Sequence, residues 1–443
     1  MLKRSLLACA LLPLWAPAHA TPELDDLRAE IQQLKQLYET RLGDLEARLK
    51  LAEVQPMPTA RQAESAPTQS NAFNPEMSLI LSGQYARRDD LEERVITGFM
   101  PAGGHDHGSE RGFNLNHTEL VLTANVDPLW RGQANLAIAD GEVEVEEAWF
   151  QSLGLGQGMT LKAGRFASNL GYLNEQHPHA WDFVDAPLMY QTLFGEHYIQ
   201  DGLQLKWLAP TDTFLEFGLE AGAGNNPPGA NSNTNGLGAW TAFAHIGGDI
   251  GTSSSWRAGV SYLHAKPNER AGHWEDLDAA EVETQFSGIS KTWLADFVWK
   301  WAPEGNPKER NFSLQGEWFQ RRESGDLNCL GGRCGVESTD AYATRQSGWY
   351  AQALYQFMPA WRAGLRYERL DSGKQDFGAT NGTLLETPEY DPSKLSLMLD
   401  WSPSEFSRLR LQYAKDKSMV GIDENQWTLQ YIMSLGSHGA HKF

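Results

Sequence analysis

The chain has 443 residues and a formal net charge of −20 at pH 7, and 41% of its residues are hydrophobic. So acidic a chain is a poor candidate for binding nucleic acid, whose phosphates repel carboxylates. Beyond residues 1–20 it has no apolar run long enough for a membrane-spanning helix. A membrane-spanning β-barrel stays open, because alternate residues of its strands are polar and its mean hydropathy resembles that of a soluble protein.

The N-terminus has the pattern of a signal peptide. Lys3 and Arg4 form a basic start, residues 6–15 are mainly apolar, and Ala18-His19-Ala20 is a small-x-small cleavage site. We therefore expect residues 1–20 to be removed on export.

Residues 21–54 have a helical period. Their apolar side chains step by three and four, with one extra step of four, at Leu24, Leu27, Ile31, Leu34, Tyr38, Leu42, Leu45 and Leu49. This spacing, with a stutter, predicts a periplasmic coiled coil that oligomerises. A single amphipathic helix that lies against the rest of the chain is the alternative. Residues 55–75 are rich in Pro, Ala, Ser, Thr and Gln and predict a flexible linker.

From residue 76 to residue 443 the pattern changes to a period of two. Leu395, Leu397 and Leu399, for example, alternate with Ser396 and Met398. A period of two sends neighbouring side chains to opposite faces of a strand. One apolar and one polar face over strands of about ten residues predicts an all-β fold, an antiparallel transmembrane barrel.

Sixteen segments have this pattern. They are 77–88, 113–126, 131–140, 142–151, 159–167, 200–208, 212–222, 238–248, 255–265, 288–301, 311–321, 347–358, 360–370, 393–402, 406–416 and 425–436. Short turns alternate with long connections, as expected when one barrel end faces the periplasm and the other the outside. An even number of strands places both chain ends on the periplasmic side.

These features resemble the sixteen-stranded outer-membrane porins, loosely the phosphate-selective group. The resemblance rests on the terminal aromatic Phe443, the strand Leu161-Lys162-Ala163-Gly164-Arg165-Phe166 and the long connection after the fifth strand. Chains with an ending like His-Gly-Ala-His are also named zinc-regulated TonB-dependent outer membrane receptors. The resemblance implies the outer membrane of a Gram-negative bacterium and a connection 168–199 that folds into the barrel and narrows its pore.

The connection 168–199 is therefore the first candidate site. It carries the acids Glu175, Asp182, Asp185 and Glu196 and the imidazoles His177, His179 and His197. At a constriction, imidazole and carboxylate together suit a divalent transition metal such as zinc. The alternative is a polar loop whose histidines form local hydrogen bonds.

Two rows of charge are predicted on the strands. Glu142, Glu144 and Glu146 alternate along 142–151 and are expected to face the lumen, since carboxylates are costly in lipid. By the same parity His117 and Glu119 face the lumen nearby, although a β-bulge would change the assignment. Arg362 with Arg366, and Arg408 with Arg410, form a basic ladder that would oppose the acids across the pore.

Two smaller features lie in other connections. His105, Asp106 and His107 form a short tract in a glycine-rich loop, which predicts either weak metal capture or a mobile surface loop. Cys329 and Cys334 are the cysteines left after signal cleavage, and in an exported protein they predict a disulfide. Half of a metal site is the alternative for this pair.

The motifs of common enzymes (HExxH, GxSxG and the P-loop) do not occur in the chain, which predicts that it is not an enzyme. The leading hypothesis is a trimeric porin, held by barrel and coiled coil in outer-membrane lipid, for passive diffusion of small hydrophilic solutes or ions. It requires no cofactor, although zinc is a candidate ligand or solute. The alternatives are a TonB-dependent-type receptor for zinc or another divalent metal, although only residues 21–76 are available here for its plug domain, and a structural tether of the envelope.

Overall fold

The computed structural model describes residues 75–91, 94–100, 111–115, 117–139, 142–230, 235–386 and 389–436. The predicted signal peptide, the coiled coil, nearly all of the linker and the tract at residues 105–107 lie outside these ranges. The described residues belong to the compact unit Ser70–Phe443.

Most of this unit is a single antiparallel sheet. Its strands are β1 Glu76–Arg87, β2 Gly112–Leu115, β3 Thr118–Asn125, β4 Trp130–Ala139, β5 Glu142–Ser152, β6 Met159–Ala167, β7 Ile199–Leu208, β8 Phe214–Gly222, β9 Ala239–Ile250, β10 Ser254–Ala265, β11 Arg270–Glu275, β12 Glu281–Trp301, β13 Asn311–Leu330, β14 Ser338–Met358, β15 Trp361–Asp371, β16 Gln375–Asp376, β17 Ser393–Ser404, β18 Ser407–Lys417 and β19 Glu424–Gly436. The helical segments are η1 Pro178–Ala180, α2 Leu188–Phe194, η2 Pro303–Gly305, η3 Gly332–Cys334 and α3 Gly378–Asn381.

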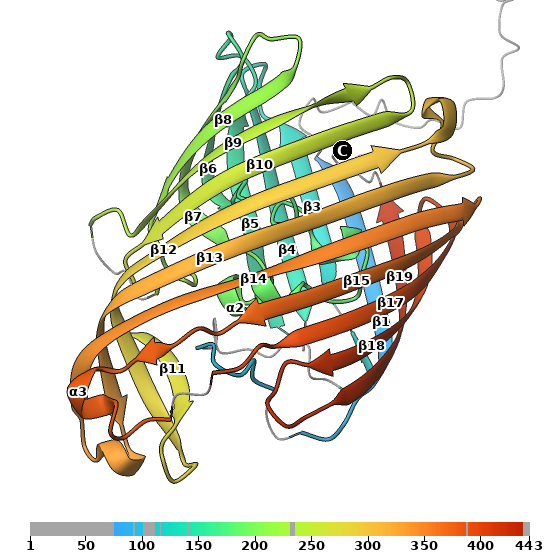
Figure 1. Cartoon of the computed structure of the whole chain (residues 1–443). Coiled ribbons are helices and arrows are strands. Elements are labelled where there is room, and N and C mark those ends of the chain that lie inside the picture. Colours follow the sequence, from blue (N-terminus) through green and yellow to red (C-terminus); the bar gives the residue numbers. More distant parts are fainter. Residues whose placement is uncertain are drawn as a thin grey trace, which may run out of the picture. The chain divides into compact units, whose positions relative to one another are not determined.

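The sheet closes on itself, because β1 pairs with β19 over Ser78 to Arg87 (Figure 1). The nineteen strands of the described residues occupy sixteen positions in the barrel wall, because three positions are each shared by two consecutive strands. β2 and β3 both pair with β1, β10 and β11 both pair with β12, and β15 and β16 both pair with β14. The predicted all-β, sixteen-stranded antiparallel barrel is therefore confirmed. No helix of the described residues is long and apolar enough to cross a membrane.

The period of two sorts side chains between the two faces of the wall. On β17, Leu395, Leu397 and Leu399 are 37–47% exposed on the outside, whereas Ser396 and Asp400 are fully buried inside. Burial of the polar residues and exposure of the apolar ones is the reverse of a soluble protein. It is the arrangement that a closed barrel in a bilayer requires.

Aromatic pairs form two belts on the outer face. Near the short turns, Trp361 stacks on Trp401, and higher up Trp349 packs against Tyr367. The six residues from Trp361 to Tyr367 span about 20 Å along β15. This approximates the apolar band of an outer-membrane barrel, which aromatic girdles border on both sides.

Three neighbouring strands extend well beyond that band. β12, β13 and β14 have 21, 20 and 21 residues, about twice the length needed to cross the hydrocarbon layer. Much of the predicted connections 266–287 and 322–346 is therefore strand, and Figure 1 shows these ribbons continuing towards β11 and α3. The extension has an apolar cluster that includes Phe286, Leu327 and Tyr342, and a disulfide joins Cys329 and Cys334 at its tip.

Candidate functional site in the barrel lumen

The connection 168–199 crosses the inside of the barrel. Its backbone bonds to strands on several sides of the wall. Gly171 N donates to Ser261 Oγ of β10 (3.2 Å), Leu173 N donates to Glu317 Oε1 of β13 (3.0 Å), and Arg410 Nη2 of β18 donates to Trp181 O (2.7 Å). These strands are far apart around the barrel, so the connection occupies the lumen.

An apolar core holds the connection against one part of the wall. Leu188, Met189 and Leu193 of α2 are fully buried, together with side chains of β9, β10 and β12 to β15, namely Ala239, Leu263, Ala265, Leu294, Phe319, Tyr350 and Leu370. Gly171 shows how closely the chain is seated. Its φ is +68°, and a Cβ there would collide with Glu317 and Tyr190. Burial of this apolar surface stabilises the position of the connection inside the barrel.

Asp185 attaches the connection to the adjoining part of the wall, formed by β15, β17 and β18. Its carboxylate lies 2.8 Å from Arg366 Nη2 of β15 and 2.6 Å from Lys394 Nζ of β17, and Gln412 Nε2 of β18 donates to it at 3.0 Å. Burial raises the pKa of the Asp185 carboxyl, but Lys394 and Arg366 outweigh burial and hold that pKa well below its usual range. Asp185 is thus an ionised anchor for the connection.

The predicted basic ladder faces the same region, and acids neutralise it. Arg362 lies 3.1 Å from Asp182 and 2.5 Å from Asp400, and Arg410 Nε lies 2.8 Å from Asp400 Oδ1. Arg408 Nη1 donates to the carbonyl of Trp181 at 3.1 Å. The arginines therefore bind the connection and their own wall, and they do not form an open strip of positive charge.

The acidic row on β5 differs from the expectation. Asn135 pairs with Glu147 and Leu136 with Val145, so that Glu146 is the extra residue of a β-bulge. Both Glu146 and Glu147 are consequently buried, whereas Glu142 and Glu144 are exposed near the start of the strand. Glu144 pairs with the inward Ala137, so Glu142 and Glu144 face the inside of the barrel, at the exposed start of the strand. The bulge adds Glu147 to the inward acids, and of the predicted three only Glu146 belongs to the buried site.

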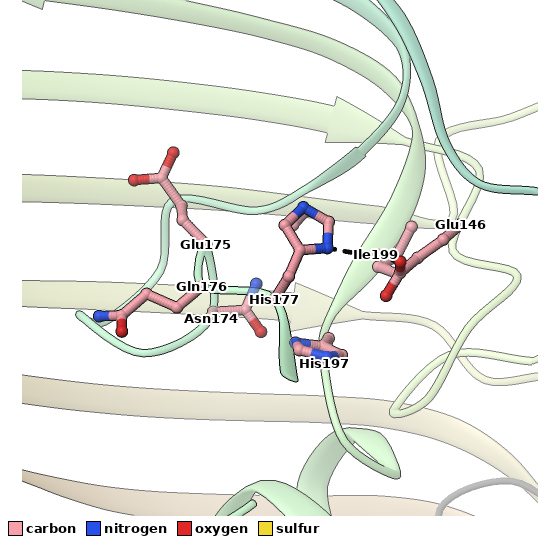
Figure 2. A pocket seen from close by; sticks show the side chains of 8 residues that line it. Glu146, Asn174, Glu175, Gln176, His177, His197 and Ile199 are labelled. Carbon is pink, nitrogen blue, oxygen red and sulfur yellow. Dashed lines mark ion pairs between the residues drawn. The ribbon is translucent and has the colours of Figure 1, made fainter. Parts of the chain in front are cut away.

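Glu146 belongs instead to a cluster of histidines and carboxylates. His117 Nε2 lies 3.2 Å from Glu146 Oε2 and 3.6 Å from Glu119 Oε1. From the connection, His177 Nδ1 lies 3.4 Å from Glu146 Oε2 and 3.5 Å from Glu119 Oε2, and His179 Nδ1 lies 2.7 Å from Glu119 Oε1. Figure 2 shows His177 directed towards Glu146, with their ion pair dashed. The strands β3 and β5 and the connection thus meet at this cluster.

Burial and charge act in opposite directions on the imidazoles of the connection. Burial lowers the pKa of His177, but Glu119 and Glu146 outweigh it and raise that pKa well above its ordinary value. At His197 burial prevails, and the pKa falls to about 4 despite the nearby Glu146. His177 is therefore cationic and paired at neutral pH, whereas His197 is neutral.

Glu175 and His197, two further candidates of the connection, line a pocket together with Glu146 and His177. Figure 2 shows the carboxylate of Glu175 directed away from Glu146. His197 packs on the ring of Trp181, with ring centroids 5.0 Å apart, and its Nε2 is buried with no hydrogen-bond partner in the described structure.

Sequence reasoning missed several polar groups of the lumen. Asn135 is fully buried in the cluster, and Glu317 accepts a hydrogen bond from the connection. Lys394 pairs with Asp185, and Asp400 pairs with Arg410 of the basic ladder. Each of them occupies an inward position of a predicted strand, and this parity was the available signal. What the pattern does not show is which of the many inward polar residues meet the connection.

A second connection also enters the barrel. Gly98 O accepts from Gln346 Nε2 of β14 and from Gln375 Nε2 of β16, both at 2.8 Å, and Phe99 joins the apolar core around α2. Residues 94–100 therefore cover part of the lumen as well.

Comparisons with known proteins agree with a barrel of this type. No family model matches the chain. Among solved structures, OmpTdeltaL8, a loop L8 deletion mutant of the Vibrio cholerae outer membrane protein OmpT, has a TM-score of 0.50 and 11% identity, over 82% of this chain and 99% of that chain. The outer membrane channel DcaP of Acinetobacter baumannii has a TM-score of 0.47 and 13% identity, over 82% and 96% of the two chains.

The fold likeness and the apolar outer face together place the protein in the outer membrane. A sequence relative in Aquifex aeolicus (strain VF5) carries the name uncharacterized protein. It is 31% identical to this chain over an alignment of 404 residues that covers 85% of this chain and 82% of the relative. This chain belongs to the same protein family as that Aquifex aeolicus relative.

Proposed function

We propose that the protein is an outer-membrane porin for passive diffusion of small hydrophilic solutes or ions, and not an enzyme. The observation that carries the proposal is the closed sixteen-stranded barrel with a polar inner face. Inward side chains such as Gln204, Thr241, Gln315, Gln352, Gln412 and Gln430 make the inner face polar, as the wall of an aqueous channel is.

The connection 168–199 sets the size limit in this proposal. Its apolar core and its anchor at Asp185 hold it across the lumen, so that a solute passes only through the space left beside it. Solutes that the barrel would otherwise admit are excluded, and the passage of larger ones requires the connection to move.

The charges of the constriction are nearly balanced. Arg362, Arg366 and Lys394 each lie within 3.1 Å of a carboxylate oxygen. We therefore expect weak selectivity between cations and anions, in place of the strong transverse field that separate acidic and basic walls would create.

Conductance in planar lipid bilayers tests the proposal. The purified protein should insert and give discrete, ohmic conductance steps, and the reversal potential in a salt gradient should lie close to zero. A correctly folded barrel that never conducts would contradict a porin. A strongly asymmetric reversal potential would contradict balanced charge only.

The trimer through barrel and coiled coil remains part of the proposal. Chemical crosslinking of the mature protein in detergent should give a ladder that ends at three subunits. The TonB-dependent-type receptor and the envelope tether depend on residues 1–74, which lie outside the described residues, and they stay alternatives.

A further inference from the structure

We propose that His117, Glu119, Glu146 and His177 bind one divalent transition-metal ion of the zinc class, between the barrel wall and the connection 168–199. Glu119 lies on β3 and His117 directly precedes that strand, Glu146 lies on β5, and His177 lies in the connection. A metal ion bound by all four would join parts of the chain that are far apart in sequence.

The distances between the candidate ligand atoms fit a coordination polyhedron better than a set of hydrogen bonds. Atoms bound about 2.0 Å from a zinc ion at the corners of a tetrahedron lie about 3.3 Å from one another. His117 Nε2 and His177 Nδ1 lie 3.2 and 3.4 Å from the same oxygen of Glu146, Oε2, and 3.6 and 3.5 Å from the two different oxygens of Glu119, Oε1 and Oε2. Three of these four distances exceed the usual 2.7–3.2 Å range of an N–H···O hydrogen bond.

The ligand types also select the metal. Two imidazole nitrogens with two carboxylates suit zinc and its neighbours in the first transition row, whereas magnesium and calcium prefer oxygen alone. One ligand atom each from His117, Glu119 and Glu146 lie within 4.8 Å of one another. All three side chains come from rigid strands or their ends, which favours a site that exists before the metal binds.

Asn135 gives an independent indication that the cluster binds a cation. It is fully buried, and its Nδ2 lies 3.0 Å from Glu119, 2.8 Å from Glu146 and 3.1 Å from His177, while its Oδ1 has no hydrogen-bond partner in the described structure. Rotation of the amide would exchange nitrogen and oxygen. It would direct the unpartnered oxygen at the same centre, where a cation is the partner that it lacks.

The surroundings supply the outer contacts that metal ligands need. Glu147 Oε2 lies 3.5 Å from His177 Nε2, on the ring edge opposite the proposed metal, and His179 Nδ1 contacts Glu119. Carboxylates behind ligating imidazoles orient the ring and increase its basicity. His197, whose buried Nε2 also has no partner in the described structure, lines a pocket together with Glu146 and His177.

Metal binding would fix the connection against β3 and β5. This consequence rests on the proposed porin function, because a connection held more firmly across the lumen lowers conductance. The site itself does not depend on transport. Binding and conductance are therefore measured separately.

Binding is tested on the folded mature protein in detergent. The protein carries His105→Ala, His107→Ala, His438→Ala and His441→Ala, so that the histidines of the first loop and the tail do not compete. Titration with Co²⁺ should give one equivalent with the intense visible absorption of a four- or five-coordinate ion, and Zn²⁺ should displace it. Electron paramagnetic resonance of bound Cu²⁺ should show at least two imidazole nitrogens, a measurement that needs no further variant.

Glu146→Gln and His117→Ala should each weaken Co²⁺ binding by about 10–100-fold or more. Glu119→Gln serves as a second carboxylate variant if Glu146→Gln does not fold, as judged by heat-dependent migration on a gel. The matched control is His273→Ala, which removes an exposed histidine that also contacts a carboxylate, Glu281, at 2.8 Å. It should leave the affinity unchanged. Absence of one-equivalent binding, or equal affinity in the folded cluster variants, would overturn the site and leave a buried ion-pair network.

Conductance completes the test. Zn²⁺ should lower the conductance of this protein, a chelator should restore it, and Glu146→Gln should abolish the response. Metal binding by a barrel that never conducts would refute the porin and keep the site. Conductance without metal binding would refute the site and keep the porin.

Discussion

Asp185 connects the loop in the lumen to three strands through Arg366, Lys394 and Gln412. A carboxylate in this place has to be ionised, because two buried cations face it. The histidine–carboxylate cluster around Glu119 is the corresponding contact to another part of the wall, at β3 and β5. Single residues therefore determine where the connection lies.

Asp185→Asn should loosen the connection. Removal of one charge of a buried pair leaves the partner cations uncompensated, which costs about 3–5 kcal/mol of unfolding free energy. Urea unfolding in detergent should show this loss, and single-channel conductance should rise because the connection obstructs the lumen less. Asp391→Asn, at the exposed pair with Arg369, is the control and should change neither quantity. An unchanged conductance in folded Asp185→Asn would contradict the anchor.

The effect of Asp185→Asn should also depend on pH. Lys394 and Arg366 hold the folded-state pKa of Asp185 below the ordinary aspartate value of about 3.9. Its stabilisation is therefore complete above that value and declines as the pH falls through and below it. The difference in unfolding free energy between wild type and Asp185→Asn should shrink by about 1 kcal/mol between neutral pH and about pH 3. A difference that grows in acid would show that Asp185 is not held in its ionised form.

At the scale of elements, strands were predicted well and their irregularities were not. The predicted segment 142–151 corresponds to β5 Glu142–Ser152, because alternation is local and lipid enforces it. The bulge at Glu146 coincides with the adjacent pair Glu146-Glu147, where the alternation of Glu and Val breaks, but this break alone did not show which of the two is the extra residue. The ends of β12 to β14 were assigned to connections, because outside the bilayer their outer face carries polar residues such as Arg322 and Asp326 and no apolar alternation is required.

The path of the connection 168–199 through the lumen depends on contacts with residues that are far away in the sequence. The charged and histidine residues of 168–199 were recognisable as a cluster, and the resemblance to porins predicted an inward fold. Which wall residue each of them meets follows from the order of sixteen strands around the barrel. Local sequence does not contain the pairing of His177 with Glu119, 58 positions earlier in the numbering.

The extension of β12 to β14 should depend on its disulfide without affecting transport. Cys329 and Cys334 are five positions apart, and a loop of that size restricts the unfolded chain by about 2 kcal/mol. Replacement of both by serine should make the β13–β14 tip sensitive to proteases, as limited proteolysis with mass spectrometry would show. Conductance should stay the same, and Val336→Ser in the same turn should leave proteolysis unchanged. Loss of conductance would mean that the extension supports the pore.

For the whole molecule, the position of the bilayer is the decisive quantity. The outer belts of Trp361 and Trp401 on one side and Trp349 and Tyr367 on the other define an apolar band, with Leu397 between them. The long tips that carry Val336 lie outside it. Two residues with high exposure should therefore face different solvents.

Leu397→Arg and Val336→Arg separate these two environments. Leu397 is 47% exposed and Val336 is 95% exposed. An arginine in the middle of a lipid-facing band costs about 2–4 kcal/mol, and this cost falls to nearly zero at the surface of the bilayer. Unfolding of the two variants in lipid vesicles should thus give a large loss for Leu397→Arg and almost none for Val336→Arg, although the second side chain is the more exposed. A large loss of unfolding free energy in both variants would place the tip in lipid as well. A negligible loss in both would place Leu397 outside the membrane and would require the barrel to be inserted at a different height.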